Sequence, residues 1–385
     1  MPPAKAGFSN HAGNNLTKAR INRETFMHRR HLLAASALTL GVAAAGAALA
    51  DDPLQIGFIY IGPVGDHGWT FTHDKARLDV EEHFGDRVTT TYVENVAYGA
   101  DAERVMTQMA LSGVEMIFAT SFGYGPDVNA VAQRFPDVAF EHATGYIQEA
   151  PNVSLYNARF YEGRAVIGHI AGKMTETNTI GYIASFPIPE VVMGINSAFL
   201  HAREVNPDVQ FRVVWVYSWY DPAQEAAAAE ALIEQGADIL MQHTDSTAPV
   251  TVAQDRGIYA FGQASDMTSF APESHLTAIL DEWGPYYIER VQAKLDGEWE
   301  AGNVWHGIDD GMVGFAPFND AIPEDVRAEA EDMIERISSG EYHPFTGPIN
   351  RQDGTPWLED GETAPDGDLL GMDFYVEGMT GSVPN

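Results

Sequence analysis

The densest set of reactive side chains follows a short apolar run, Ile239–Met241. His243, Asp245 and Ser246 stand there within four consecutive residues, which allows three kinds of chemistry. His243 and Asp245 could join Glu141-His142 in a metal site, but the spacing matches no metal signature. Ser246 lacks the G-x-S-x-G turn that exposes the nucleophile of an α/β-hydrolase. Hydrogen bonding to a small ligand, with no metal or cofactor, is therefore the favoured interpretation.

Aromatic and polar side chains also follow other apolar runs of the chain. Trp69 comes after Ile56–Ile61, and Phe122 comes after Met116–Thr120, each among glycines that would let a ligand approach closely. Open parallel α/β sheets bind ligands beyond the carboxyl ends of their strands, where these residues would gather. No catalytic residue is predicted. The predicted ligand-binding residues are Asp66, Trp69, Phe122, Tyr124, Trp219, His243, Asp245, Gln263, Asp281 and Trp283.

Trp69 and Trp219 would approach the ligand from facing lobes. Two aromatic side chains can enclose a planar heterocycle, and stacking contributes about 0.5–1.5 kcal/mol beyond the burial of area. Ionised carboxylates only accept hydrogen bonds, so acids at the strand ends suit ring N–H and amino donors. Arg159 and Arg164 are interpreted as charges at the start of a helix. The pattern therefore indicates a neutral or amino-bearing heterocycle rather than a phosphate or carboxylate.

The elements that must position these residues alternate between strand and helix, which predicts parallel sheets with right-handed crossovers. One helix shows apolar residues from Ala102 to Ala110 at helical spacing. Another has Asp221 as N-cap, Pro222 in its first turn and Gly236 after its end. The expected strands are 55–61, 87–93, 116–120, 138–140, 179–184, 211–217, 238–241, 259–261, 275–280 and 312–317.

These elements fall into two similar α/β units, which implies two lobes facing each other across a cleft. We expect lobe I to comprise residues 51–158 and 276–302, and lobe II to comprise residues 159–275 and 303–340. The last segment, 341–385, is rich in Gly, Pro and Asp. It is expected to be a partly disordered surface extension with a hairpin around Asp353-Gly354.

Composition excludes several classes of function. The chain has 385 residues, enough for two domains, and a net charge of −33. Such a charge argues against nucleic acid, whose binding rests on cationic contacts to phosphate, and self-repulsion favours a monomer. The loop Gly65–Gly68 has neither the Lys of a P-loop nor the spacing of a dinucleotide fingerprint.

The first 50 residues read as a targeting segment. Arg29-Arg30 precede an apolar run from Leu32 to Ala50, which ends in a small-x-small cleavage site. Met27 would begin a compact signal peptide, so residues 1–26 would be an over-extended start. The run is too rich in Ala and Gly for a membrane anchor. We therefore expect export, through the general or the twin-arginine route, with cleavage near Ala50.

Three motifs together resemble the basic membrane protein (BMP) family of periplasmic substrate-binding proteins, which serve ABC importers. They are Gly65-Asp66-His67-Gly68-Trp69, Arg159-Phe160-Tyr161-Glu162-Gly163 and His243-Thr244-Asp245-Ser246-Thr247. The resemblance implies a type I periplasmic-binding fold, two lobes joined by three crossover strands, with an ABC permease and ATPase as partners. It also implies a purine base or nucleoside as ligand, stacked on Trp69 and Trp219 and read by an Asp.

Two departures from the family pattern refine this expectation. Nucleoside-binding members place a Lys after the strand that corresponds to 276–280, but this chain has Asp281-Glu282-Trp283. A free purine base such as adenine is therefore favoured over a nucleoside. Many members are lipoproteins, but this chain has no cysteine to carry a lipid. The alternatives are a receptor for another small polar solute, such as a sugar, and a periplasmic enzyme acting on purines.

Overall fold

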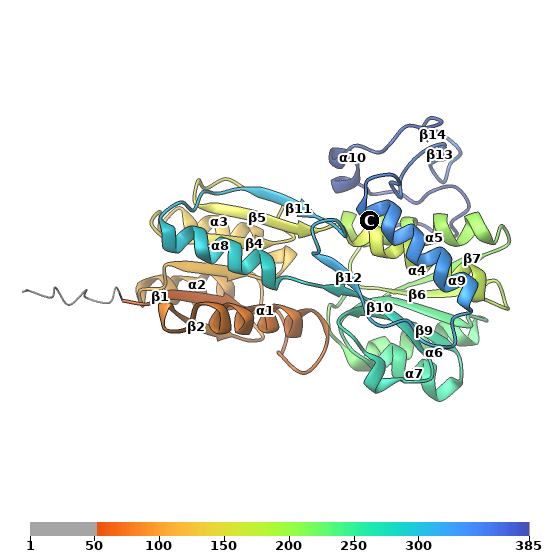
Figure 1. Ribbon diagram of the computed structural model, residues 1–385, viewed down its shortest axis with the longest axis horizontal. Coiled ribbons are helices and arrows are strands. Elements are labelled where there is room, and N and C mark those ends of the chain that lie inside the picture. The colour runs from red at the N-terminus through yellow and green to blue at the C-terminus, as the bar shows by residue number, and fades with distance from the viewer. Residues whose placement is uncertain (1–51, 385) are drawn as a thin grey trace, which may run out of the picture. The chain divides into compact units, whose positions relative to one another are not determined.

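The computed structural model describes residues 52–384, so the expected signal peptide and its cleavage near Ala50 lie outside the described residues. Within this range the chain forms two six-stranded sheets, each flanked by helices (Figure 1). The expected α/β class, with parallel sheets in two lobes, is confirmed. In the described part of the chain, no helix combines the length and the apolarity needed to cross a membrane.

Lobe I consists of β1 Leu54–Ile59, α1 Gly68–Phe84, β2 Val88–Val93, α2 Ala100–Leu111, β3 Met116–Ala119, α3 Gly125–Ala132, β4 Ala139–Ala143, β5 Val153–Ala158, α8 Gly284–Asp296 and β11 Asn303–His306. Its sheet is entirely parallel, in the order β11-β5-β4-β3-β1-β2. Phe58 of β1 shares a core with α1 and α8, whereas its neighbour Ile59 shares one with α2 and α3. Alternate side chains thus bury both faces of the sheet.

Lobe II consists of α4 Phe160–Met174, β6 Thr179–Ala184, α5 Pro189–Val205, β7 Gln210–Trp215, α6 Pro222–Glu234, β8 Ile239–His243, α7 Ala248–Arg256, β9 Tyr259–Ala264, β10 His275–Asp281, β12 Val313–Phe315 and α9 Glu324–Ser338. Its sheet has the order β12-β10-β9-β8-β6-β7, and only β12 is antiparallel to its neighbour. Helix α6 begins as predicted, because the Asp221 carboxylate accepts the backbone N–H of Gln224 at 3.0 Å.

Sheet pairing corrects the expected places of two strands. Residues 276–280 were expected in lobe I, but β10 pairs with β9 in the second sheet. Residues 303–306 were expected in lobe II, but β11 pairs with β5 in the first sheet. Both strands lie next to places where the chain crosses between the lobes. At such places the order of elements along the chain does not determine which of the two sheets a strand joins. In the described residues the chain crosses after β5, after β10 and after β11.

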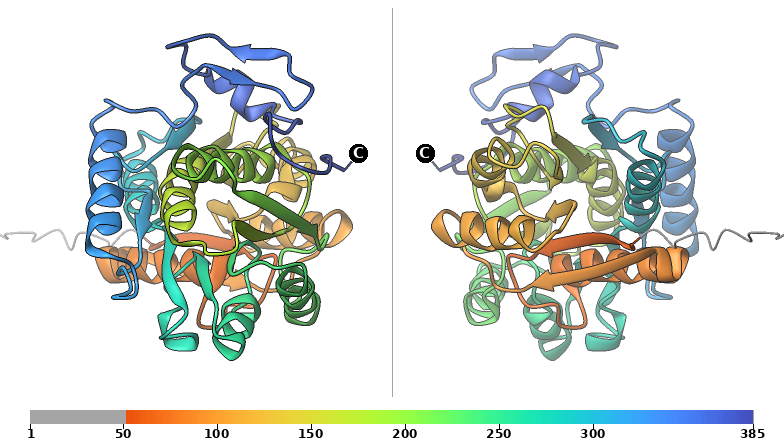
Figure 2. Two further views of the ribbon diagram at one scale, coloured as in Figure 1. Left: turned by 90° about the vertical axis from the view of Figure 1, so that its right-hand side faces the viewer. Right: turned by 90° about the vertical axis from the view of Figure 1, so that its left-hand side faces the viewer.

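The C-terminal extension contains β13 Ile349–Asn350, β14 Pro356–Leu358 and α10 Asp366–Leu370. Strands β13 and β14 pair antiparallel across Asp353-Gly354, which confirms the predicted hairpin. The segment lies against lobe II (Figures 1 and 2). The segment is packed and ordered, not partly disordered as expected, because Phe345, Leu369 and Val376 are buried. Its Phe374 carbonyl oxygen also accepts a hydrogen bond from the side-chain amide of Asn196 in α5.

Candidate ligand-binding site

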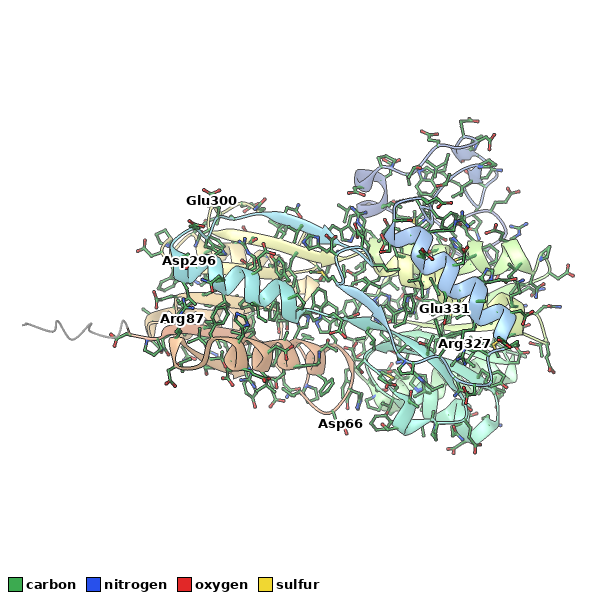
Figure 3. The ribbon with its side chains drawn as sticks, viewed as in Figure 1. Asp66, Arg87, Asp296, Glu300, Arg327 and Glu331 are labelled. Atoms are coloured by element: carbon green, nitrogen blue, oxygen red, sulfur yellow. The ribbon has the colours of Figure 1, made fainter. Side chains whose placement is uncertain are left out.

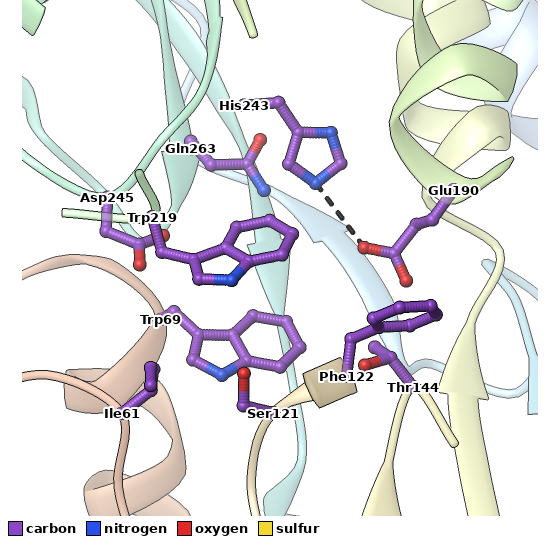
Figure 4. Close-up of a pocket in the computed structure, with 10 residues that line it drawn as sticks. All are labelled: Ile61, Trp69, Ser121, Phe122, Thr144, Glu190, Trp219, His243, Asp245 and Gln263. Carbon is purple, nitrogen blue, oxygen red and sulfur yellow. Dashed lines mark ion pairs between the residues drawn. The ribbon is translucent and has the colours of Figure 1, made fainter. Parts of the chain in front are cut away.

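One pocket lies where loops at the carboxyl ends of strands from both sheets meet (Figure 4). The loops after β1, β3 and β4 and the start of α1 form its lobe I side. The loop after β7, the end of β8 with the loop that follows it, β9 and the start of α5 form its lobe II side. It encloses about 360 Å³ of space free of protein atoms, its open side included. The residues that line it are Ile61, Trp69, Ser121, Phe122, Thr144, Glu190, Trp219, His243, Asp245 and Gln263.

Trp69 and Trp219 face each other across this pocket (Figure 4). The indole N–H of Trp69 donates to the carbonyl oxygen of Thr120, at the end of β3, at 2.6 Å. The indole N–H of Trp219 donates to the hydroxyl of Tyr98, in lobe I, at 2.9 Å. Each indole is therefore held by its ring nitrogen while it lines the pocket. Both residues therefore line the same pocket, one from each lobe.

A layer of buried aromatic side chains supports Trp69 from behind. The ring of His73 meets the indole edge-on at 4.5 Å between centroids and stacks on Trp283 at 4.8 Å. Trp283 also meets Trp69 edge-on at 5.4 Å. Nδ1 of His73 forms a hydrogen bond with the hydroxyl of Tyr287. Burial lowers the pKa of His73 well below its usual value. This packing holds the Trp69 indole in one orientation.

The end of the pocket beside α5 is polar. Nε2 of His243 lies 3.5 Å from Oε1 of Glu190 (Figure 4). Arg164, which is fully buried in α4, donates to Oε1 of Gln263. Burial lowers the pKa of His243 and that of Arg164. Several buried atoms here, including Oε2 of Glu190, Nε of Arg164 and Nδ1 of His243, have no hydrogen-bond partner in the protein. They are suited to pair with a polar ligand, because unpaired buried polar groups are costly.

The buried carboxyl group of Asp281 and the half-buried one of Asp245 add to this polar set. Burial raises the pKa of Asp281 well above its usual value, and the nearby Glu190 and Asp245 raise it further. Burial also raises the pKa of Asp245, with a further contribution from Glu225. Neither oxygen of Asp281 has a partner in the protein. A carboxyl group that keeps its proton can donate as well as accept, so it can pair with a ring nitrogen or with an N–H group.

The two lobes touch at the mouth of the site. The backbone N–H of Gly68 in lobe I donates to Oγ of Ser265 in lobe II at 2.7 Å. Gly68 has φ +79°, and a Cβ atom there would lie 2.5 Å from the carbonyl oxygen of Asp245. Only glycine accommodates both the dihedral angle and the close approach. This residue therefore allows the lobes to meet over the pocket.

Strained backbone surrounds the pocket. Thr144 lines it with φ +52°, Ala264 follows Gln263 with φ +62°, and Tyr217 lies two residues before Trp219 with φ +49°. Residues other than glycine rarely adopt this region, and a β-branched residue such as Thr does so least readily. Strain of this kind clusters at functional sites, where the surrounding structure holds it in place.

Six of the predicted binding residues line the pocket, and four do not. Asp66 is directed outward (Figure 3), with a side chain 77% exposed and 2.7 Å from Nδ1 of His67. Tyr124 is buried, and its hydroxyl donates to the carbonyl oxygen of Val96, so it belongs to the core of lobe I. Asp281 and Trp283 are buried behind the lining residues. The six that line it are Trp69, Phe122, Trp219, His243, Asp245 and Gln263.

Sequence reasoning missed Glu190 and misread Arg164. Glu190 is in the first turn of α5, where an acidic residue is expected for helix stability alone. Arg164 was interpreted as a charge at a helix start, but it is fully buried beside the pocket. The signal that could have found it is a cation followed at once by the apolar and small residues Ala165–Gly168 within α4. Ile61, Ser121 and Thr144 carried no distinguishing signal.

The catalytic and metal alternatives find no support in the described residues. Ser246 is buried, and its hydroxyl donates to Oε2 of Glu225 at 2.7 Å instead of pairing with His243. Glu141 lies in a separate cluster with Arg290 at 2.7 Å and the hydroxyl of Tyr286 at 2.7 Å. From residue 52 to residue 384, no group of three or more His, Cys, Asp or Glu side chains is placed to hold a metal.

Comparison with known sequences gives a consistent result. Residues 54–343 match the Bmp family model, described as ABC transporter substrate-binding protein PnrA-like. A purine-binding protein of Brucella abortus (strain 2308) is 57% identical and covers 90% of this chain and 99% of the relative. A Haloferax volcanii protein with the provisional name ABC transporter glucose-binding protein is 37% identical and covers 87% of this chain and 82% of the relative.

Solved structures show the same fold. A solute-binding protein of an ABC transporter system from Aeropyrum pernix K1 superposes with a TM-score of 0.65, at 18% identity, over 78% of this chain and 93% of that one. A solute-binding protein from Conexibacter woesei superposes with a TM-score of 0.62, at 19% identity, over 75% of this chain and 98% of that one. The expected type I periplasmic-binding fold is confirmed.

Proposed function

The chain belongs to the Bmp family of PnrA-like substrate-binding proteins of ABC transporters, and on this premise we propose that it binds a free purine base such as adenine. The ligand lies between the indoles of Trp69 and Trp219. Membership of a family of binding proteins sets aside the alternative of an enzyme acting on purines.

The facing indoles are the observation that carries this proposal. Both line one pocket, each is held by its ring nitrogen, and each comes from a different lobe. A flat aromatic ligand gains stacking on both faces only in such a slot. The purine-binding relative at 57% identity supports a purine over another aromatic ring.

The polar groups beside the indoles suit the edge of a purine base. Glu190 supplies an acceptor, and the amide of Gln263, whose Oε1 accepts from Arg164, supplies an N–H donor. The carboxyl groups of Asp245 and Asp281 can each donate or accept. A base such as adenine offers ring nitrogens and an amino group to such a set. The sequence Asp281-Glu282-Trp283, in place of the Lys expected for a nucleoside, favours the free base over adenosine.

The protein then acts as the exported receptor of an importer. Its lobes close around the base, bury it, and present the closed form to a membrane permease that an ATPase drives. The direct contact between Gly68 and Ser265 supports closure at this mouth. We propose export to the periplasm with cleavage near Ala50, no lipid anchor, no affinity for nucleic acid, and a monomeric receptor.

Calorimetric titration tests the ligand class. Purified protein, unfolded and refolded to remove bound ligand, is titrated with adenine, adenosine and glucose. We expect saturable binding of adenine at one site per chain and binding of adenosine at least about tenfold weaker, which is 1.4 kcal/mol. The sugar ligand suggested by the Haloferax volcanii relative predicts the reverse. Binding of glucose without binding of adenine would refute the proposal.

A further inference from the structure

Arg164 and Gln263 form a hydrogen-bonded pair at the wall of the pocket. Arg164 is fully buried in α4, and Gln263 of β9 lines the pocket. Nη2 of Arg164 donates to Oε1 of Gln263. Arg164 itself does not line the pocket. The influence of its guanidinium on a bound ligand therefore passes through the side chain of Gln263.

The guanidinium determines which end of the Gln263 amide faces the pocket. A guanidinium has N–H donors and no acceptor, whereas an amide has an acceptor oxygen on one side and N–H donors on the other. Only the amide oxygen can therefore pair with Arg164, so the NH₂ group must lie on the opposite side. Figure 4 shows the amide nitrogen of Gln263 on the side of Trp219 and the oxygen directed away from it. The wall thus presents an N–H donor to the pocket.

Neighbouring elements hold the Arg164 side chain in place. Its Cζ atom lies 5.4 Å from the centre of the Tyr182 ring, which belongs to β6. A Cβ atom at Gly194 of α5 would lie 3.4 Å from Cγ of Arg164, so this helix packs closely against it. None of the side chain reaches solvent. Since the guanidinium has a fixed direction, the amide paired with it has one too.

Glu190 gives the same pocket an acceptor. Its Oε1 lies 3.5 Å from Nε2 of His243, and its Oε2 has no partner among the described residues. An ionised carboxylate only accepts hydrogen bonds. Adenine is complementary to this pair of wall groups, because its amino group donates and the adjacent ring nitrogen N1 accepts. Hypoxanthine has the same ring system, but it carries an oxygen at position 6 and an N–H group at N1.

We propose that Arg164 is a positioning residue that selects 6-aminopurines over 6-oxopurines by fixing the direction of the Gln263 amide. The inference rests on the proposed function, because the base must lie between Trp69 and Trp219 for its edge to meet this amide. The amide N–H donates to N1, and Glu190 accepts from the amino group. A 6-oxopurine in the same place sets donor against donor and oxygen against carboxylate. Such unpaired buried polar groups reject the wrong ligand strongly.

Calorimetric titration with adenine, hypoxanthine and 1-deazaadenine tests the wall of the natural protein. Adenine should bind at least about tenfold more tightly than hypoxanthine, which reverses both hydrogen bonds. It should also bind at least about tenfold more tightly than 1-deazaadenine, which has C–H in place of N1 and keeps the amino group. A smaller preference in either comparison would overturn the inference. If the natural protein binds no purine at all, the proposed function fails instead.

Gln263→Glu tests the direction of the hydrogen bond with almost no change in size. The variant replaces the NH₂ group with an oxygen, and the adjacent Arg164 favours the ionised carboxylate, which cannot donate. The ratio of adenine affinity to hypoxanthine affinity should fall at least about tenfold. The matched control is Gln133→Glu, at an exposed glutamine that follows α3, and it should leave the ratio unchanged. An unchanged ratio in Gln263→Glu would overturn the inference.

Arg164→Met and Arg164→Lys separate positioning from a merely structural role. The methionine variant frees the amide to turn, so adenine and hypoxanthine should bind within about threefold of each other. Lysine also has donors and no acceptor, so Arg164→Lys should restore the preference for adenine. Thermal unfolding shows which variants are folded, and if Arg164→Met is not, the ratio in Gln263→Glu decides. Weaker binding of both bases at an unchanged ratio in folded Arg164→Met would show that Arg164 only supports the fold, and the inference would be wrong.

Discussion

The indole N–H of Trp219, in lobe II, donates to the hydroxyl of Tyr98, in lobe I, at 2.9 Å. One wall of the pocket is therefore oriented by the opposite lobe. The Tyr98 hydroxyl also lies 2.8 Å from Oγ of Ser121, which lines the same pocket. Since this hydrogen bond joins the two lobes, it ties the orientation of the Trp219 indole to the position of lobe I.

Tyr98→Phe removes this contact and should weaken binding of adenine about two- to tenfold, the value of one hydrogen bond of 0.5–1.5 kcal/mol. The loss should appear mainly as faster dissociation, because an opened lobe releases the ligand. Stopped-flow tryptophan fluorescence measures both rates. Tyr92→Phe, at an exposed tyrosine on β2, is the matched control. Equal dissociation rates for Tyr98→Phe and the natural protein would show that the contact does not hold the closed form.

Trp69→Ala should weaken binding of adenine at least about tenfold, or 1.4 kcal/mol, because one face of the stack is lost. Trp69→Phe should retain most of the affinity, since it keeps an aromatic face. Titration calorimetry gives both affinities, and thermal unfolding checks that the variants are folded. Unchanged affinity in Trp69→Ala would remove this residue from the binding site.

Asp281→Asn should change how the stability of the unliganded protein depends on pH. The pKa of Asp281 is raised in the folded state, so its contribution to stability is complete below the unfolded pKa of about 3.9 and is lost as pH rises through the folded pKa. Asp281→Asn has no carboxyl group to ionise, so it does not lose stability in this way. It should therefore become more stable relative to the natural protein as pH rises from 5 to 8. Its affinity for adenine should fall.

Urea unfolding at a series of pH values measures this difference for Asp281→Asn. Asp66→Asn is the control, because that carboxylate is exposed and lies outside the pocket. It should leave both stability and affinity unchanged. Parallel pH profiles for Asp281→Asn and the natural protein would contradict the buried, unpaired state of this carboxyl group.

His201 should destabilise the protein in acid. Its Nδ1 donates to the carbonyl oxygen of Ser197, so its Nε2 accepts from the hydroxyl of Tyr342 only while the ring is neutral. Burial lowers its pKa to about 4. The stability it contributes is therefore present above the unfolded pKa of about 6.5 and is lost as pH falls towards 4, by roughly 3 kcal/mol.

His201→Gln should lose less stability than the natural protein between pH 7 and pH 4.5, as measured by urea unfolding. His83→Gln, at an exposed histidine of α1, is the matched control and should follow the natural protein. If the free energy of unfolding falls equally steeply with pH in all three proteins, His201 is not the acid-sensitive group.

Much of the fold followed from local patterns. The strand 179–184 and the cap of α6 at Asp221 were predicted correctly, because apolar runs and capping residues act within a few positions of the chain. Strand β5 and helix α7 were not predicted. The lobes expected for β10 and β11 were wrong, since pairing beside a crossing depends on which lobe each strand reaches.

The pocket was predictable only in part for a related physical reason. Trp69 and Trp219 follow strands, and the carboxyl ends of parallel strands converge, so their meeting could be inferred. Whether a loop side chain turns inward depends on a few dihedral angles, and Tyr124 and Asp66 turned away from the pocket. The burial of Arg164 depends on contacts with distant residues such as Gln263, which no local pattern encodes.

The most direct test of the central claim is a crystal structure of the protein grown with adenine. The account predicts the purine ring between the indoles of Trp69 and Trp219, with its polar edge towards Glu190, Gln263 and the carboxyl group of Asp245 or Asp281. Adenine bound elsewhere would contradict it. So would a structure in which the two indoles touch each other and leave no space for the base.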